Sequence, residues 1–105
     1  MLRIYPVTLD VVRDAATMAD SISLHDSDLA RQLRRASASV VLNVGEGDGS
    51  TAGTRRARYV SALGSAREVR ACYDVALALG YGVAGDDARD RLDRIVATLY
   101  KITRR

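Results

Sequence analysis

The chain has 105 residues, of which 48% are hydrophobic, and its 16 Lys and Arg against 13 Asp and Glu give a formal net charge of +3. This length suits one domain, so we expect residues 1–105 to form a single folded unit, and the composition excludes a disordered chain. The single cysteine excludes an intramolecular disulfide and a cysteine-based metal site. No apolar run reaches the roughly 18 residues of a membrane span, and no signal-peptide pattern is present. We therefore expect a cytoplasmic protein with no membrane partner.

The first half of the sequence predicts two helices. Residues 7–23 carry a stripe of apolar side chains at helical spacing, made of Val11, Val12, Ala15, Ala16, Ala19 and Ile22. After a break at residues 24–27, a second helix is predicted over about residues 28–44, with Asp26 or Ser27 as its N-cap. Its stripe consists of Leu29, Leu33, Ala36, Val40 and Val44, and we expect Asn43 to fall on it. Glycine then predicts an exit from the helix and a loop over residues 45–53.

The second half predicts two more helices. The third covers about residues 54–79, from the spacing of Tyr59, Leu63, Ala66, Val69, Tyr73, Ala76 and Leu77, and Gly80 ends it. Gly64 in its interior costs about 1 kcal/mol in helix propensity, which the close approach of a neighbouring helix would offset. The fourth covers about residues 86–103, where Ala88, Leu92, Ile95, Leu99 and Ile102 form a narrow seam. Four amphipathic helices with short loops predict an all-α, antiparallel up-down four-helix bundle.

Three motifs in this order resemble a known family. The segment QLRRASASVVLNVGEG (residues 32–47) resembles that family's pattern of Gln-Leu-Arg-Arg-Ala, then Ser-(Ile/Val), then Asn-Ile-Ala-Glu-Gly. Asn43, Glu46 and Gly47 match, while Val44 and Gly45 are mild departures. In the third helix, YVSALGSARE (residues 59–68) places Gly64, Ser65 and Glu68 in register, and LALGY (residues 77–81) closes that helix. The resemblance is to the bacterial four-helix bundle proteins first noted as products of intervening sequences in large-subunit ribosomal RNA genes. One departure is Asp48, which follows the Glu-Gly pair where family members often carry basic residues.

The resemblance implies a bundle that assembles into a ring, typically a pentamer. A related branch serves as the accessory protein of diversity-generating retroelements, where the ring binds nucleic acid and a reverse transcriptase through a positively charged surface. Most other members of the family have no defined cellular role, so the resemblance supports the fold and the assembly more than an activity.

The motif's polar residues permit two interpretations. The structural one is that Asn43 bonds a neighbouring helix or loop backbone, that Glu46 ties down the glycine-rich loop, and that Ser65 and Glu68 support the same packing. The alternative is that the two glutamates form a carboxylate pair for acid–base chemistry or metal binding. We favour structure, because the Glu-x-x-His partners of di-iron bundles are missing. His25 is the only histidine, and Cys72 is expected to be a packed helix residue. The sequence therefore offers no catalytic set, metal site or cofactor site.

Arginines are concentrated in the middle of the chain. Against three acidic residues, residues 31–70 carry Arg31, Arg34, Arg35, Arg55, Arg56, Arg58, Arg67 and Arg70. They form either a solvated face, or pairs with acidic residues of sister subunits, or a surface that follows nucleic-acid phosphates. A ring would multiply each patch and raise avidity. No basic motif interleaved with aromatic residues is present, so we expect recognition by charge and shape.

The sequence leaves two functions open. The first is a non-enzymatic homo-oligomer, a pentameric ring whose basic surface binds RNA or DNA, or a nucleic-acid enzyme such as a reverse transcriptase. The alternative is a protein-binding adaptor or structural ring with no nucleic-acid role. A small enzyme ranks third, because catalytic groups are scarce.

Overall fold

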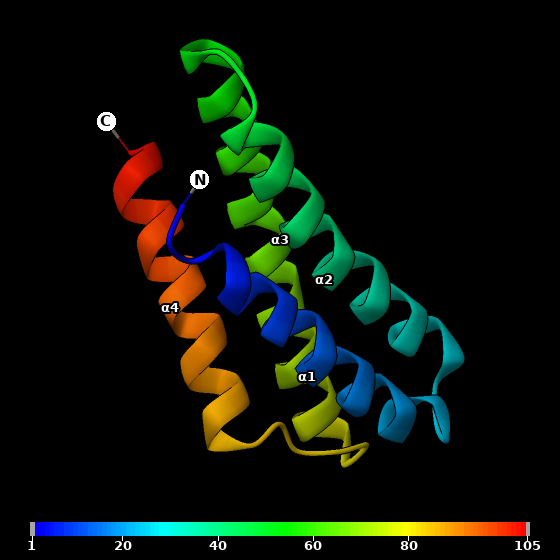
Figure 1. The fold of residues 1–105 in the computed structure, drawn as a ribbon. Coiled ribbons are helices and arrows are strands. Elements are labelled where there is room, and N and C mark those ends of the chain that lie inside the picture. Colours follow the sequence, from blue (N-terminus) through cyan, green and yellow to red (C-terminus); the bar gives the residue numbers. More distant parts are fainter. Residues whose placement is uncertain (1, 105) are drawn as a thin grey trace.

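The computed structural model describes residues 2–104, which form four helices and contain no β-strand. The helices are α1 (Tyr5–Ser23), α2 (Ser27–Asp48), α3 (Ala52–Leu79) and α4 (Asp86–Thr103). Successive helices run in opposite directions, and each packs on the next, with α4 returning to α1 (Figure 1). The predicted all-α antiparallel four-helix bundle is confirmed.

Each helix buries one stripe of mostly apolar side chains. The predicted stripe of α2 is fully buried, and that of α3 is buried except for Leu77, whose exposed fraction is 52%. In α1, Thr8 and Met18 are buried while Ala16 is exposed. The Thr8 hydroxyl donates to the Tyr5 carbonyl, which satisfies it inside the core. Many of the buried side chains are alanine, which lets the helix axes approach closely.

The α2–α3 connection is much shorter than predicted. Helix α2 continues through Gly45, Glu46 and Gly47 to Asp48, so only residues 49–51 separate it from α3. The prediction of a loop over residues 45–53 is therefore wrong. Glycine here does not end the helix; a Cβ atom at position 47 would lie 2.5 Å from Cε1 of Tyr59, so Gly47 lets α3 pack closely against the last turn of α2.

Other helix ends follow the predicted signals. The Asp26 side chain accepts a hydrogen bond from the Leu29 amide at 2.9 Å and caps the start of α2. Gly80 adopts the left-handed conformation, with φ of 73°, and ends α3. Helix α4 has the predicted bounds.

Gly64 does not behave as expected. A Cβ atom built on it would meet no heavy atom within 4 Å outside its own helix and chain neighbours, and the residue is exposed on α3. The predicted close approach of a neighbouring helix is therefore not found within the chain. The helix-propensity cost of this glycine is not offset by packing among residues 2–104.

One ion pair ties α1 to α4. The Arg91 guanidinium donates to both oxygens of Asp14, at 2.7 and 2.8 Å, and Asp14 retains 17% of its side-chain exposure. This bidentate ion pair fixes the position of α1 relative to α4 along the bundle axis more firmly than a single hydrogen bond would. No helix within residues 2–104 combines the length and apolarity needed to cross a membrane.

Candidate functional site

Asn43 and Ser65 belong to one short polar network between α2 and α3. The Asn43 amide donates to the carbonyl oxygen and the hydroxyl of Ser39, at 2.9 and 3.1 Å. The Ser39 hydroxyl in turn lies 2.8 Å from the Ser65 hydroxyl on α3. Asn43 therefore reaches α3 only through Ser39, and it is half-buried at the edge of the stripe on which we expected it. The network fixes the relative position of the two helices at this level.

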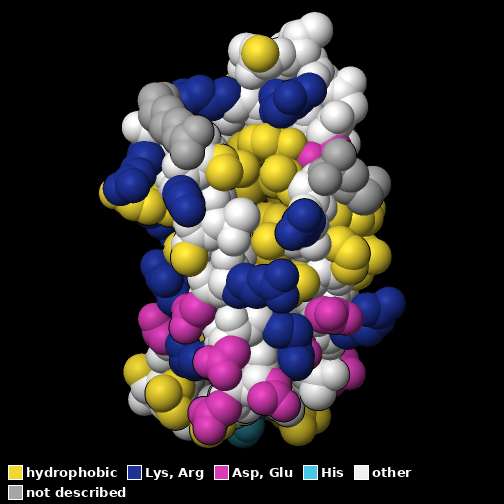
Figure 2. Space-filling view, turned by 60° about the vertical axis from the view of Figure 1, so that its left-hand side comes forward, with side chains coloured by type: hydrophobic (Ala, Val, Ile, Leu, Met, Phe, Trp, Pro, Cys, Tyr) yellow, Lys and Arg dark blue, Asp and Glu magenta, His cyan; other side chains and the backbone are white. Residues whose placement is uncertain are grey.

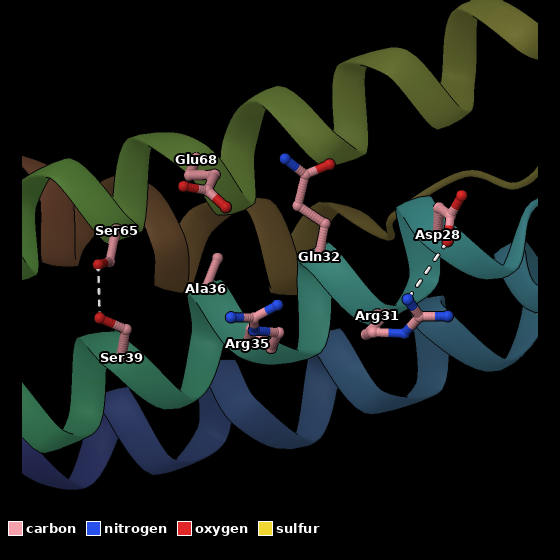
Figure 3. A pocket seen from close by; sticks show the side chains of 8 residues that line it. All are labelled: Asp28, Arg31, Gln32, Arg35, Ala36, Ser39, Ser65 and Glu68. Atoms are coloured by element: carbon pink, nitrogen blue, oxygen red, sulfur yellow. Dashed lines mark hydrogen bonds and ion pairs between the residues drawn. The ribbon is translucent and has the colours of Figure 1, made fainter.

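Ser39 and Ser65 also mark one end of an open polar groove of about 560 Å³ between α2 and α3. In Figure 3 the two helices diverge from this pair toward the start of α2. Glu68 points from α3 across the groove at the level of Ala36, and Gln32 points from α2 toward α3. The groove therefore presents carboxylate, amide and hydroxyl groups, with arginines of α2 at its rim.

Glu46 lies far from Glu68. Its carboxylate pairs with Arg58 at 3.1 Å, beside the α2–α3 turn. Glu68 lies ten residues further along α3 than Arg58, which is about 15 Å at 1.5 Å per residue. The fold does not bring the two glutamates into one carboxylate pair. Within residues 2–104, no group of three or more His, Cys, Asp and Glu side chains is arranged to hold a metal ion.

Asp48 organises the end of the bundle where α2 turns into α3. Its carboxylate accepts hydrogen bonds from the Tyr59 hydroxyl at 2.5 Å and from the Leu2 amide at 3.2 Å. A carboxylate at a helix C-terminus opposes the helix dipole, and these donors offset that cost. Burial and the adjacent Asp48 raise the pKa of Tyr59 to about 12. Asp48, the departure from the family pattern, thus joins the N-terminal segment, α2 and α3.

The eight arginines singled out in the sequence have different surroundings. Arg31, Arg34 and Arg58 form ion pairs with Asp28, Asp20 and Glu46. Arg55 donates to the Gly47 and Ser50 carbonyls, and Arg56 donates to the Thr103 carbonyl, so both satisfy groups near helix C-termini. Arg67 lies over the Tyr100 ring. Among residues 2–104, Arg35 and Arg70 form neither a hydrogen bond nor an ion pair.

Charge is instead separated along the length of the bundle. We call the end where α2 meets α3 the hairpin end; it also holds the start of α1 and the end of α4. Its basic side chains are Arg3, Arg55, Arg56, Arg58, Lys101 and Arg104. Its two acidic residues, Glu46 and Asp48, are already engaged by Arg58 and Tyr59. The acidic side chains of the opposite end are Asp20, Asp26, Asp28, Asp74, Asp86, Asp87, Asp90 and Asp93. They outnumber the basic side chains in the same part of the bundle, which are Arg31, Arg34, Arg89, Arg91 and Arg94. Figure 2 shows the acidic groups gathered at the lower end and basic groups dominating above.

Cys72 and His25, the remaining candidate groups, lie in environments typical of packing residues. Cys72 is buried, and burial, followed by the nearby Glu68 carboxylate, raises the pKa of its thiol, which disfavours the reactive thiolate. His25 lies between α1 and α2 and stacks on Tyr81, with ring centroids 5.0 Å apart. Among the residues from 2 to 104, neither side chain has a hydrogen-bond or ion-pair partner that would activate it as a nucleophile or base.

Sequence reasoning missed three contacts. Ser39 carries the link between Asn43 and Ser65, but nothing in the sequence separates it from neighbouring serines. The Asp14–Arg91 pair joins residues far apart in the chain. Tyr100 lies beside Arg67 and Arg104; the spacing of four residues between Tyr100 and Arg104 was a usable helical signal, whereas Arg67 required the fold.

We expect Asn43→Ala to destabilise the fold by about 1 kcal/mol, because it removes two hydrogen bonds from a half-buried position. Leu42→Ala is the matched control: Leu42 is 63% exposed, so its truncation should change stability by less than about 0.5 kcal/mol. Urea denaturation measures both. An Asn43→Ala variant as stable as the parent would show that the network does not support the fold.

Together, the structure defines a small all-α four-helix bundle with a polar network between α2 and α3 and a basic end opposite an acidic one. The chain belongs to the 23S rRNA-intervening sequence protein family, whose family model matches residues 2–101. No curated protein and no solved structure shows a significant match to the chain.

Proposed function

We propose that this protein is a non-enzymatic, homo-oligomeric bundle that binds nucleic acid through its hairpin end. The observation that carries this proposal is the separation of charge along the bundle. At the hairpin end the cationic side chains outnumber the two carboxylates of Glu46 and Asp48, which leaves net positive charge there. Contacts between cationic side chains and phosphates supply most non-specific affinity for nucleic acid.

The exposed face of α3 supports the oligomeric part of the proposal. Val60, Gly64, Ala71 and Val75 recur at helical spacing and are exposed in the single chain. A face of small and apolar residues suits the close approach of a second helix. The family resemblance favours a ring of five subunits, a reverse transcriptase or similar enzyme as a protein partner, and a cytoplasmic setting.

Binding should depend steeply on salt. We expect the affinity for duplex and hybrid oligonucleotides, measured by fluorescence anisotropy, to fall as NaCl rises, with a log–log slope set by the number of phosphate contacts. Replacing Arg3 and Lys101 by glutamine should weaken binding and reduce the slope by about 2. No binding at low salt, or binding indifferent to salt, would contradict the proposal.

The matched control removes the same charge elsewhere. Arg31→Gln with Arg94→Gln lowers the net charge by the same amount, away from the hairpin end. This variant should keep the parental slope. If both double variants weaken binding equally, net charge alone governs association and the hairpin end is not the contact surface.

A second candidate is a protein-binding adaptor or structural ring with no nucleic-acid role. It is favoured by large apolar side chains exposed at the opposite end, namely Leu24, Leu77, Leu79 and Val83. Such clusters commonly mark protein contacts. The ratio of absorbance at 260 and 280 nm separates the candidates, because a nucleic-acid-binding protein purified at low salt retains its ligand and an adaptor does not.

A further inference from the structure

Tyr100 is an exposed aromatic residue with two cationic side chains close to its ring. Its exposed fraction is 48%, whereas those of the buried Tyr59 and Tyr73 are 7% and 1%. The Arg67 guanidinium of α3 lies 5.9 Å from the ring centroid, and that of Arg104, the residue directly after α4, lies 5.6 Å from it. The fold thus assembles an aromatic ring interleaved with basic groups, although no contiguous segment of the sequence shows one.

Tyr73 is also close to an arginine, but its surroundings are those of a core residue. Arg89 lies 5.8 Å from the Tyr73 ring centroid, but that ring is fully buried and Arg89 is neutralised by Asp74 at 2.9 Å. Neither Arg67 nor Arg104 forms an ion pair with any residue from 2 to 104. Within residues 2–104 the cations beside Tyr100 therefore have no carboxylate partner, and packing of the core does not explain the ring.

The surface around Tyr100 is open and basic. Lys101, next to Tyr100, is exposed. Arg56 donates to the Thr103 carbonyl and thereby holds the start of α3 against the end of α4. The ring and its cations are therefore carried by parts of the chain that this hydrogen bond holds together.

We propose that Tyr100, Arg67 and Arg104 form a stacking site for an unpaired nucleobase, with the two guanidinium groups contacting the flanking phosphates. The inference rests on the proposed nucleic-acid function and names its ligand as single-stranded nucleic acid. Base stacking on an aromatic ring is stronger than an exposed cation–π contact, so a base displaces a guanidinium from the ring and frees it for phosphate. Bases in a duplex are held in their own stack and cannot use the ring.

The test compares a labelled single-stranded oligothymidylate with a duplex of the same length by fluorescence anisotropy across a salt series. Tyr100→Leu should weaken single-strand binding roughly tenfold and leave duplex binding unchanged. Tyr100→Phe keeps the stacking surface and should bind like the parent. Because Tyr100→Leu removes no charge, its salt slope should equal the parent's, whereas Arg67→Gln with Arg104→Gln should reduce the slope.

Tyr81→Leu is the control, since it removes a tyrosine at the opposite end of the bundle. If the parent binds nucleic acid but Tyr100→Leu binds single strands as the parent does, the stacking site is overturned and the proposed function stands. If the parent binds neither oligonucleotide, the proposed function fails. Light scattering covers the remaining outcome: weakened binding that accompanies a smaller assembly would assign the ring to a subunit contact and overturn the stacking site.

Discussion

Gly47→Ala should destabilise the protein by about 2 kcal/mol and lower its melting temperature by about 10 °C. In most helix interiors this substitution is stabilising, because alanine is the better helix former by about 1 kcal/mol. Here the new Cβ atom would lie 2.5 Å from Cε1 of Tyr59 and 3.3 Å from Cβ of Arg58. The Tyr59 ring would have to move, and its hydrogen bond to Asp48 would be lost. Thermal unfolding followed by circular dichroism measures the change.

Gly45→Ala is the control for this prediction. The position is exposed on the same helix, and the nearest atom to its Cβ would be Cε1 of Tyr5 at 3.6 Å, an ordinary contact. We expect this variant to be more stable than the parent by about 0.5–1 kcal/mol. Opposite signs at positions two residues apart would locate the effect in the contact with Tyr59. If Gly47→Ala is also stabilising, the close packing of α2 against Tyr59 is wrong.

Stability should fall steeply in alkali, between pH 10 and 12. Tyr59 and Tyr73 both have a pKa of about 12 in the folded protein against 10 ordinarily, chiefly because burial penalises the charged phenolate. In this window the unfolded chain has released the phenolic protons and the folded chain has not, so rising pH favours unfolding. Each unit of pKa difference corresponds to about 1.4 kcal/mol, so Tyr73 alone lowers the free energy of unfolding by on the order of 2 kcal/mol at pH 12.

Phenylalanine variants separate the two rings, because phenylalanine cannot ionise. Tyr73→Phe should flatten the fall in stability between pH 10 and 12, as measured by urea denaturation at each pH. Tyr59→Phe should remove the part of the alkaline fall in stability that Tyr59 contributes. This variant should also be less stable at neutral pH, since it loses the hydrogen bond to Asp48. A fall of unchanged steepness in the doubly substituted protein would trace the alkaline transition to other groups.

Helical periodicity was sufficient to predict the fold. The apolar stripe of α2, the bounds of α4 and the end of α3 at Gly80 all follow from spacing and capping, which are local properties. Gly45 and Gly47 misled the prediction because glycine has two uses: it ends helices, and it lets another helix approach. Only the position of Tyr59, contributed by α3, distinguishes these uses, and helical periodicity does not contain that information.

Less of the candidate site could be predicted, for a related reason. Local charge counting drew attention to the arginines of residues 31–70, but what each one does depends on which helix lies beside it. Arg34 meets Asp20 of α1, and Arg56 meets the last turn of α4. Arg67 reaches the Tyr100 ring in the same way. Pairings across helices are properties of the tertiary structure, whereas Asn43 and Glu46 could be singled out because motif residues stand together in the chain.

The separation of charge between the two ends gives the molecule an electric moment along its 42 Å axis. Near any polyanion this moment produces a torque that turns the hairpin end inward and the aspartate-rich end outward. Each molecule would therefore be oriented before it makes contact, and every copy would bind with its hairpin end toward the polyanion. Copies bound side by side on one nucleic-acid polymer would present an outer surface of aspartates and exposed leucines to any further binding partner.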